Sequence, residues 1–488
     1  MRALRRGLIA ATLAAVLAPQ GAAAQERITP AEALRIASTT AEVRREQAAN
    51  PRTYLRASSE PRDRWRVSLF VAPSGEEVAQ VHVDAFTGEV LEAWTGVQVE
   101  WQMARGYPGA FGRKVNDPWI WIGLSLMFVL PFLRGPPRML HLDLAVLLAF
   151  GLSYAAFNSA EIGVSVPTVY PLLAYLLARM LWVARRPPPA PTPLLSAQAL
   201  VVALMFLVGV RIALNLTGNV IDVGTASVVG ADRLAAGEPL YGAFPPPVER
   251  GDTYGPVLYA AYVPFELLLP DRAAAHAAAM AFDLGCLVLL WRLGGVLAAY
   301  LWAAYPFAAL ASASGSNDAL VTLLVLAAIL AAHRPVARGA LAALAGLTKL
   351  APLALAPLLV GRRLAAIAAF AVTGALILAP FDLGTLLDRT VGFQADRDSP
   401  FSIWGDVEVL QRIVQLAAFA LAIGVAFVKR RDRRTLAALA AAVLIAVQLG
   451  ADHWFYLYLV WFAPLTWLAL LGAGSARSSP PAAAARSG

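Results

Sequence analysis

The strongest constraint on this chain is the succession of apolar runs between Trp119 and Leu471, which only polar loops interrupt. An apolar run of about 20 residues is long enough to cross the hydrocarbon core of a bilayer as an α-helix. Backbone polar groups must be satisfied inside the membrane, so successive runs of this kind fold as a helical bundle. We therefore predict a polytopic α-helical membrane protein with about 12–13 membrane segments.

The N-terminus carries the three parts of a secretory signal peptide. A basic head ends at Arg6, a short apolar stretch follows through Ala18, and small residues occupy positions 22–24. The apolar part is too short to span a membrane comfortably, so we predict that residues 1–24 are a cleaved signal peptide. The domain that follows is then expected outside the cytoplasm.

Residues 25–117 have the mixed composition of a soluble domain, and we predict a small exported α+β fold there. Thr29 and Glu32 have the spacing of a capping box, which predicts a helix over residues 29–49. Three runs with alternating apolar residues are predicted strands: 65–71, 78–84 and 89–94.

The strand–turn–strand stretch Val81–Leu91 resembles the PepSY-type module. The resemblance covers about sixty residues of the exported domain. It implies a binding or regulatory role, and it assigns no catalytic residue. We expect His82 to lie on the surface of its strand.

The distribution of charge favours a membrane orientation over a nucleic-acid partner. The chain is 59% hydrophobic and 15% charged, with a formal net charge of +8. Its basic residues flank the apolar runs, which is the pattern of cytoplasmic loops in plasma-membrane proteins. We therefore predict a multi-pass protein of the plasma (inner) membrane, with an extracytoplasmic N-terminal domain and a cytoplasmic C-terminal tail.

The orientation of the runs divides the membrane part into segments. A Pro-rich stretch marks a composition shift between the first spans and the main bundle. The predicted parts are a three-span N-terminal membrane part (118–186), a linker (187–194), a main membrane module (195–472) and a disordered tail (473–488).

Two long loops of the main module, residues 215–254 and 382–406, are predicted on the exported face and hold most of its acids. Asp222 is placed to cap a helix that runs to Ala236 and ends at Gly237. The segment 339–360 has basic residues at both ends, so we interpret it as a re-entrant hairpin with Lys349 near its tip.

Several motifs of the main module resemble the GT-C superfamily of glycosyltransferases, most of all the bacterial mannosyltransferase-like family that uses polyprenyl-phosphate sugars. The resemblance spans roughly residues 196–472. This chain departs from the family in its fused N-terminal domain and three extra spans. The matching features are Asp222 after a crossing, the stretch Ala235–Tyr241, the step Tyr254–Pro256, Gly315–Asp318, Thr348–Pro352 and Pro400–Trp404.

The resemblance implies transfer of a hexose, with mannose as the family-level expectation, from a polyprenyl-phosphate carrier to an acceptor hydroxyl with inversion. A carboxylate outside the membrane acts as general base in such a transfer. Asp222 matches the position of the family's loop acid and is the predicted base, with a purely structural helix cap as the alternative. Asp232 ranks second, because Arg233 beside it favours a solvated ion pair.

Two basic residues fall inside apolar segments. A lysine deep in a bilayer costs about 2.5–3.5 kcal/mol, so Lys349 needs an anion. The carrier phosphate is one candidate, and a nearby acid or helix carbonyls are the other. Arg211 faces the same alternatives, with snorkelling to the interface favoured over a phosphate contact.

Three further residues complete the predicted substrate-binding set. His453 begins the last helix on the predicted catalytic side, where a neutral imidazole can hydrogen-bond a phosphate or an acceptor hydroxyl. Tyr254 and Trp404 belong to the matching motifs. Asn317 and Asp318 are expected only to cap a helix.

No cofactor and no metal site are predicted. None of the five histidines stands in a ligand-spaced cluster, and no Gly-rich phosphate loop suggests a nucleotide-sugar donor. A single cysteine, Cys286, excludes a disulfide within the chain.

The expected partners are a polyprenyl-phosphate-linked sugar donor, a glycan or glycolipid acceptor and membrane lipid, without nucleic acid. Two other functions remain open from the sequence. A lipid or solute transporter (flippase) also needs many helices and buried charge, but we find no duplicated halves with interrupted helices. A membrane sensor with a ligand-binding exported domain is the second alternative.

Overall fold

The computed structural model describes residues 27–60, 63–106, 110–134, 136, 138–246, 248–395, 401–405, 407–429 and 432–471. The predicted signal peptide and the predicted C-terminal tail lie outside these residues. The chain divides into two compact units, Met1–Gln102 and Met103–Gly488. The first unit therefore ends earlier in the chain than the predicted domain boundary at residue 117.

The first unit is an α+β domain, as the sequence predicts. Two helices, α2 (Pro30–Ala37) and α3 (Ala41–Ala49), pack against an antiparallel sheet with strand order β1-β2-β3-β4. The strands are β1 (Thr53–Glu60), β2 (Arg64–Val71), β3 (Glu76–Asp84) and β4 (Val90–Thr95). Its core is formed by apolar side chains from both helices and from β2 and β3: Ala33, Ala37, Val43, Val67, Leu69, Ala79, Val81 and Val83.

The capping box predicted at the start of this domain is present, with Thr29 and Glu32 as its two members. The single helix predicted over 29–49 is wrong, because the chain turns after Ala37 and Thr40 caps a second helix. The three predicted strands correspond to β2, β3 and β4. Strand β1 was missed because it is a polar edge strand with few apolar residues to mark it.

His82 is not the surface residue that the sequence suggests. Its side chain is 8% exposed and lies between two carboxylates. Its Nε2 atom is 4.0 Å from Glu60 and its Nδ1 atom is 3.7 Å from Glu92. Acidic side chains from β1 and β4 thus lie close to this histidine of β3.

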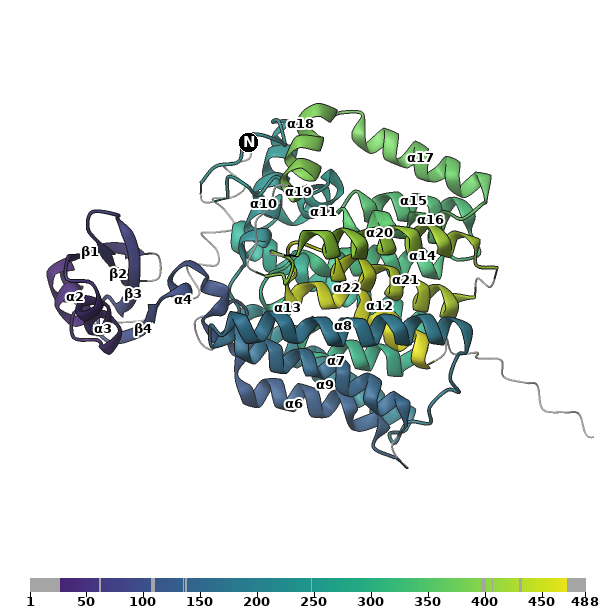
Figure 1. Cartoon of the computed structure of the whole chain (residues 1–488), viewed down its shortest axis with the longest axis horizontal. Helices are drawn as coiled ribbons and strands as arrows, with labels where there is room; N and C mark the ends of the chain where they lie inside the picture. The colour runs from purple at the N-terminus through teal and green to yellow at the C-terminus, as the bar shows by residue number, and fades with distance from the viewer. Residues whose placement is uncertain are drawn as a thin grey trace, which may run out of the picture. The chain divides into compact units, whose positions relative to one another are not determined.

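The second unit is helical, and Figure 1 shows its long helices running in roughly the same direction. Its N-terminal helices are α6 (Pro118–Val129), α7 (Met139–Asn158), α8 (Ile162–Arg185) and α9 (Ala197–Thr217). The middle of the unit contains α10 (Asp222–Ala236), α11 (Pro256–Glu266), α12 (Asp271–Ala304), α13 (Pro306–Ala313), α14 (Asp318–Leu330) and α15 (Pro335–Gly346). The last helices are η4 (Ala351–Leu355), α16 (Ala356–Val360), α17 (Leu364–Leu378), α18 (Leu383–Leu387), α20 (Glu408–Gly424), α21 (Arg433–Leu449) and α22 (Leu459–Leu471).

The helical membrane class is confirmed, and the described residues contain fewer helices of membrane-spanning length than the 12–13 predicted segments. In the described part of the chain, five helices are long and apolar enough to span a membrane, or six if a pair bent by 107° counts as one span. Three of the predicted crossings form the helices α14, α21 and α22, which have 13, 17 and 13 residues. Helices of 13 residues fall below the range of about 17–25 residues that a crossing needs, and α21 is at its lower limit. The predicted pair of segments around Arg292 corresponds to two helical stretches of α12, which meet at the non-helical residue Gly295 with φ of 73° and ψ of −171°.

A buried ion pair holds three of these helices together. The Nε atom of Arg211 in α9 donates to Oδ2 of Asp283 in α12 at 2.9 Å, and its Nη2 atom donates to the carbonyl of Ala308 in α13 at 2.8 Å. Trp302 also donates to Asp283. The predicted snorkelling of Arg211 to the interface is therefore wrong, because its guanidinium is 1% exposed and has partners inside the bundle.

The turn between β3 and β4 contains a carboxyl group that makes the first unit sensitive to acid. The backbone N–H groups of Thr87 and Phe86 donate to Asp84 at 2.8 and 2.9 Å and hold the pKa of its carboxyl below its usual value. A group with a lowered folded-state pKa stabilises the fold above its unfolded pKa of about 3.9, and this contribution is lost as the pH falls below that value.

We predict that Asp84→Ala lowers the amide protection of residues 80–95 by about threefold to tenfold at pH 6, because two backbone donors lose their acceptor. Hydrogen exchange on the full-length protein measures this effect. The difference between wild type and variant should shrink as the pH is lowered to about 3. An equal difference at both pH values would contradict the assigned role of the ionised carboxylate.

Candidate active site

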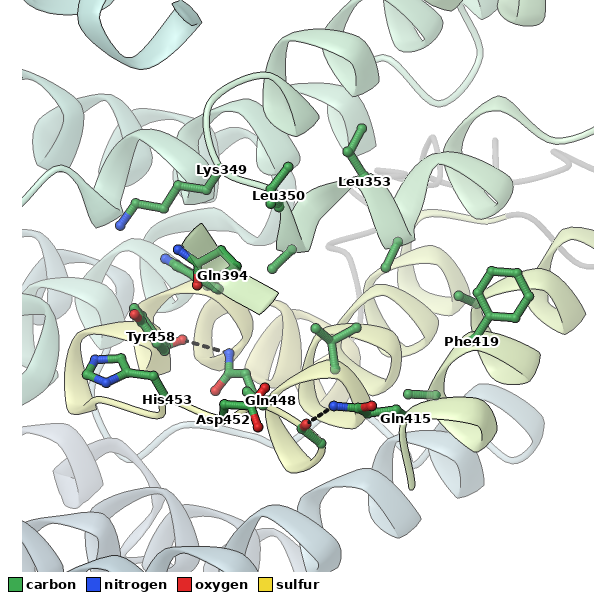
Figure 2. Close-up of a pocket in the computed structure, with 18 of the residues that line it drawn as sticks. Lys349, Leu350, Leu353, Gln394, Gln415, Phe419, Gln448, Asp452, His453 and Tyr458 are labelled. Carbon is green, nitrogen blue, oxygen red and sulfur yellow. Dashed lines mark hydrogen bonds between the residues drawn. The ribbon is translucent and has the colours of Figure 1, made fainter. Parts of the chain in front are cut away.

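A long cavity of about 610 Å³, the groove, lies between the hairpin that contains Lys349 and the helices α20 and α21. One part of its wall is apolar and comes from the hairpin and α20: Leu350, Leu353, Ala354, Pro357, Ala418, Phe419, Ala422 and Ile423. Phe419 is 67% exposed, so this part reaches the outer surface of the helical unit. In Figure 2, Leu353 and Phe419 lie away from the polar end, where Lys349, Gln394, Asp452 and His453 gather.

A second cavity of about 460 Å³, the chamber, adjoins the groove. Its wall is more polar and includes Asp222, Glu249, Arg250 and Asp318, together with Phe393 and Phe455. The two cavities share five lining residues: Thr253, Tyr254, Lys349, His453 and Tyr458. An apolar groove and a charged chamber thus meet at Lys349.

Lys349 forms an ion pair with Asp318 at this junction. The Nζ atom lies 2.6 Å from Oδ1 of Asp318, and both side chains are buried. Three aromatic rings surround the ammonium group, with centroids 5.0 Å (Tyr254), 5.4 Å (Trp461) and 5.8 Å (Tyr458) from Nζ. Aromatic faces at this range attract a cation and limit the directions from which solvent reaches it. The buried acid was one of the two partners that the sequence left open for Lys349.

Asp318 does more than the helix capping expected of it. It is the first residue of α14, and its carboxylate accepts hydrogen bonds from Trp461 Nε1 at 2.9 Å and from the hydroxyl of Ser316. Asn317 occupies the N-cap position, and its amide donates to Ser227 of α10 at 3.0 Å. The expectation of a simple cap is therefore wrong for both residues, which link α14 to neighbouring segments.

Close contacts between backbone segments bring the sequence motifs together in the fold. Gly224 in α10 lies against the loop before α14, where a Cβ atom would fall 2.4 Å from the carbonyl oxygen of Gly315. The N–H of Ile221 donates to the carbonyl of Ser314 at 2.8 Å. The start of α10, which carries Asp222, is therefore fixed against the loop that carries Asp318.

A second approach fixes the Tyr254 step against the lysine hairpin. A Cβ atom at Gly255 would lie 1.9 Å from the carbonyl oxygen of Leu347. The N–H groups of Gly255 and Val257 donate to the carbonyls of Thr348 and Leu347, each at 3.2 Å. Only glycine fits this contact, so its presence sets the position of Tyr254 relative to Lys349.

Asp222 lies at the wall of the chamber with an exposed side chain. The predicted helix from Asp222 to Ala236 is confirmed, and Gly237 ends it in a left-handed conformation with φ of 73°. The N-cap position is Ile221, so Asp222 is the first helical residue and not the predicted cap. Its Oδ1 atom accepts from the N–H of Val223 at 2.8 Å. A carboxylate in this position is stabilised by the helix dipole.

The structure brings four of the six predicted site residues together. Asp222 lines the chamber, and Lys349, His453 and Tyr254 line both cavities. Trp404 is 6% exposed, donates to the carbonyl of Leu449 at 3.0 Å and is not among the described residues that line either cavity. Arg211 is likewise outside both linings because it pairs with Asp283.

Sequence reasoning missed several residues of this region. Asp318 had a usable signal, because Lys349 needs an anion and Asp318 is an acid inside an apolar stretch. The sequence carries no comparable signal for Arg250, Asp252 and Arg389, because their place near the site depends on which loops pack together in the fold. In the described residues, no group of three or more His, Cys, Asp or Glu side chains is arranged to hold a metal ion.

The comparison with protein families gives this geometry a chemical context. Residues 253–393 match glycosyltransferase family 87, a family of the GT-C type. The match indicates a membrane glycosyltransferase. No curated protein and no solved structure matches the chain.

The matched segment contains Tyr254, Asp318 and Lys349, whereas Asp222 and His453 lie outside it. The match favours an enzyme over the transporter and sensor alternatives. A glycosyltransferase must hold a sugar donor and an acceptor together, and two adjoining cavities offer room for both.

We predict that Gly255→Ala destabilises the second unit by about 1–3 kcal/mol, because the new methyl group collides with a backbone carbonyl that cannot move freely. Thermal unfolding in detergent measures the change. Gly209→Ala is the matched control, since a Cβ atom there meets nothing within 4 Å. A midpoint for Gly255→Ala equal to that of the control would show that the Gly255–Leu347 contact is not tight.

Proposed function

We propose that this protein transfers a hexosyl group from a polyprenyl-phosphate carrier to a hydroxyl of a glycan or glycolipid on the extracytoplasmic face of the inner membrane. Mannose is the expected sugar on family resemblance. The observation that carries the proposal is the junction at Lys349, where an apolar groove meets a charged chamber. A lipid-linked sugar phosphate has groups of matching character in the same order: a hydrocarbon chain, an anionic phosphate and a polar sugar.

The groove suits the hydrocarbon chain of the carrier. Its apolar wall comes from the hairpin and from α20, and it reaches the exposed side chain of Phe419. Burial of a prenyl chain there removes apolar surface from water at about 25 cal/mol per Å². The carrier then enters from the membrane with its phosphate directed toward Lys349.

Lys349 is the proposed phosphate contact, together with His453, which lines the same two cavities. An ammonium group has three donors, and Asp318 engages it through one carboxylate oxygen. The remaining donors are available to a phosphate oxygen. Tyr254 and Tyr458 border both cavities, so a donor phosphate at Lys349 would place its sugar at the junction of the groove and the chamber and leave the rest of the chamber to the acceptor.

The proposed reaction is a single displacement at the anomeric carbon. The acceptor oxygen attacks C1 of the sugar, the bond from C1 to the phosphate oxygen breaks, and the polyprenyl phosphate leaves with the bonding electrons. The acceptor hydroxyl gives its proton to the carboxylate of Asp222, which acts as general base. The resemblance to GT-C enzymes implies inversion at C1. Asp222 is an exposed acid of the chamber wall, which supports this assignment.

The exported domain is proposed to have a binding or regulatory role, as its resemblance to PepSY modules implies. In this proposal the signal peptide directs the domain across the inner membrane, and the tail after residue 472 stays in the cytoplasm. The positive charge that flanks the apolar runs supports this orientation.

We predict that Asp222→Asn lowers kcat by about 100-fold or more with little change in the thermal midpoint, because an amide cannot accept the acceptor proton. The assay is transfer of labelled hexose from synthetic polyprenyl-phosphate donors to octyl glycosides by purified full-length protein. Asp232→Asn is the control, since Asp232 is an exposed acid of the same helix that lines neither cavity. Equal activity of Asp222→Asn and wild type would remove Asp222 from the mechanism.

We predict that loss of the Lys349 charge weakens donor binding by about tenfold or more, because the phosphate loses its cation. Lys349→Met alone would leave Asp318 buried without its partner, which costs about 3–5 kcal/mol. The test variant is therefore Lys349→Met combined with Asp318→Asn. Donor KM or direct binding of the polyprenyl-phosphate sugar is measured, and a folded double variant with wild-type donor affinity would make Lys349 a structural residue.

A further inference from the structure

A second ion pair joins two segments that are far apart in the sequence. The guanidinium of Arg389, in the π-helical turn Asp388–Gly392, binds the carboxylate of Asp252 through two of its nitrogens. The Nε–Oδ2 distance is 2.8 Å. A two-point contact of this kind fixes both the distance and the relative angle of the two groups. Asp252 is fully buried, whereas the side chain of Arg389 is 31% exposed.

Asp252 is the centre of a small network in the loop before α11. Its Oδ2 atom also accepts from the N–H of Gly242 at 2.6 Å, which closes the loop on itself. Arg389 makes a further bond, from Nη2 to the carbonyl of Glu249 at 2.9 Å. Arg389 therefore holds the loop at two places, residues 249 and 252.

This loop forms one wall of the chamber. Glu249, Arg250, Thr253 and Tyr254 all line it. At its C-terminal end the loop is already anchored, because Gly255 contacts the lysine hairpin. Near the middle, the hydroxyl of Tyr259 donates to the carbonyl of Gly251 at 2.7 Å. Arg389 supplies the anchor at the opposite end, where Glu249 and Arg250 lie.

The segment with Arg389 packs on the same side of the unit. Leu386 of α18 belongs to the apolar cluster that contains Ala226 of α10 and Leu258 of α11. Figure 1 shows α18 and the short helix α19 (Phe393–Ala395) near α10 and α11. Apolar contacts of the neighbouring helix α18 therefore hold the turn that carries Arg389. The position of Arg389 does not depend on the ion pair alone.

We propose that Arg389 is a positioning residue that, through Asp252 and Glu249, fixes the chamber wall and so determines the affinity for the acceptor. This inference rests on the proposed transferase function. Glu249 and Arg250 line the chamber but not the groove, so the wall that Arg389 fixes faces the acceptor side. The groove and Lys349 are held by other contacts, among them the ion pair with Asp318.

The chemistry of arginine is essential to this role. A planar guanidinium satisfies both oxygens of Asp252 and still reaches the Glu249 carbonyl, whereas a lysine ammonium is a point charge without that geometry. Arg389→Lys should therefore keep the charge but lose part of the positioning. Arg389→Gln with Asp252→Asn removes both charges and avoids an unpaired buried carboxylate.

The kinetic test uses the full-length protein and the octyl glycoside that wild type glycosylates. In Arg389→Gln/Asp252→Asn the acceptor KM should rise about tenfold or more, while donor KM and kcat at saturating acceptor stay within about threefold. Arg389→Lys should be intermediate. Arg412→Gln is the matched control, because Arg412 forms an exposed ion pair with Glu408 on α20. Equal acceptor KM in a folded variant, or a parallel loss of kcat and of both affinities, would overturn the proposal.

Hydrogen exchange separates this inference from the proposed function. In the same double variant, amides of residues 249–254 should exchange about tenfold faster, while those of 347–350 keep their wild-type rate. Unchanged exchange at 249–254 would refute the positioning role even if transfer activity is found. If wild type transfers no sugar while the exchange changes as expected, the transferase proposal fails, and with it the assignment to the acceptor.

Discussion

The site depends on one ion pair, between Lys349 and Asp318. A lysine in an apolar hairpin costs about 2.5–3.5 kcal/mol unless an anion compensates it, so the hairpin can dock only where α14 presents its acid. Asp318 in turn accepts from Trp461, which ties α22 to the same point. The groove and the chamber are the spaces left on two sides of this contact. Removal of the pair would therefore affect the shape of both cavities as well as their charge.

Glycine contacts explain why the motif segments have their particular sequences. Gly224 and Gly255 each bring one backbone to within a distance that no side chain tolerates. The first contact places Asp222 beside the loop of Asp318, and the second places Tyr254 beside Lys349. These glycines are spacers between segments, so their contribution is to geometry and not to chemistry. The short motifs recognised in the sequence are thus parts of one packing arrangement.

The sequence predicted the features that depend on local pattern, and it failed where long-range packing decides. The helical membrane class, the helix from Asp222 to Ala236 and three strands of the first unit follow from periodicity and capping signals. More crossings were predicted than the described residues contain helices of membrane-spanning length, because short apolar helices look like spans in sequence. The roles of Arg211 and Asp318 were missed because their partners lie 72 and 31 residues away. Residue composition does not reveal which helices will face each other.

Two of the three acids of the chamber wall, Asp318 and Asp222, differ in a way that suits separate roles in the proposed mechanism. The carboxylate of Asp318 is occupied by Lys349, Trp461 and Ser316. Asp222 lies exposed at the chamber wall, where an incoming hydroxyl can reach it. Its place in the first turn of α10 puts this carboxylate at the positive end of a helix. In the proposed mechanism, Asp318 therefore holds the cation that receives the phosphate, and Asp222 receives the proton.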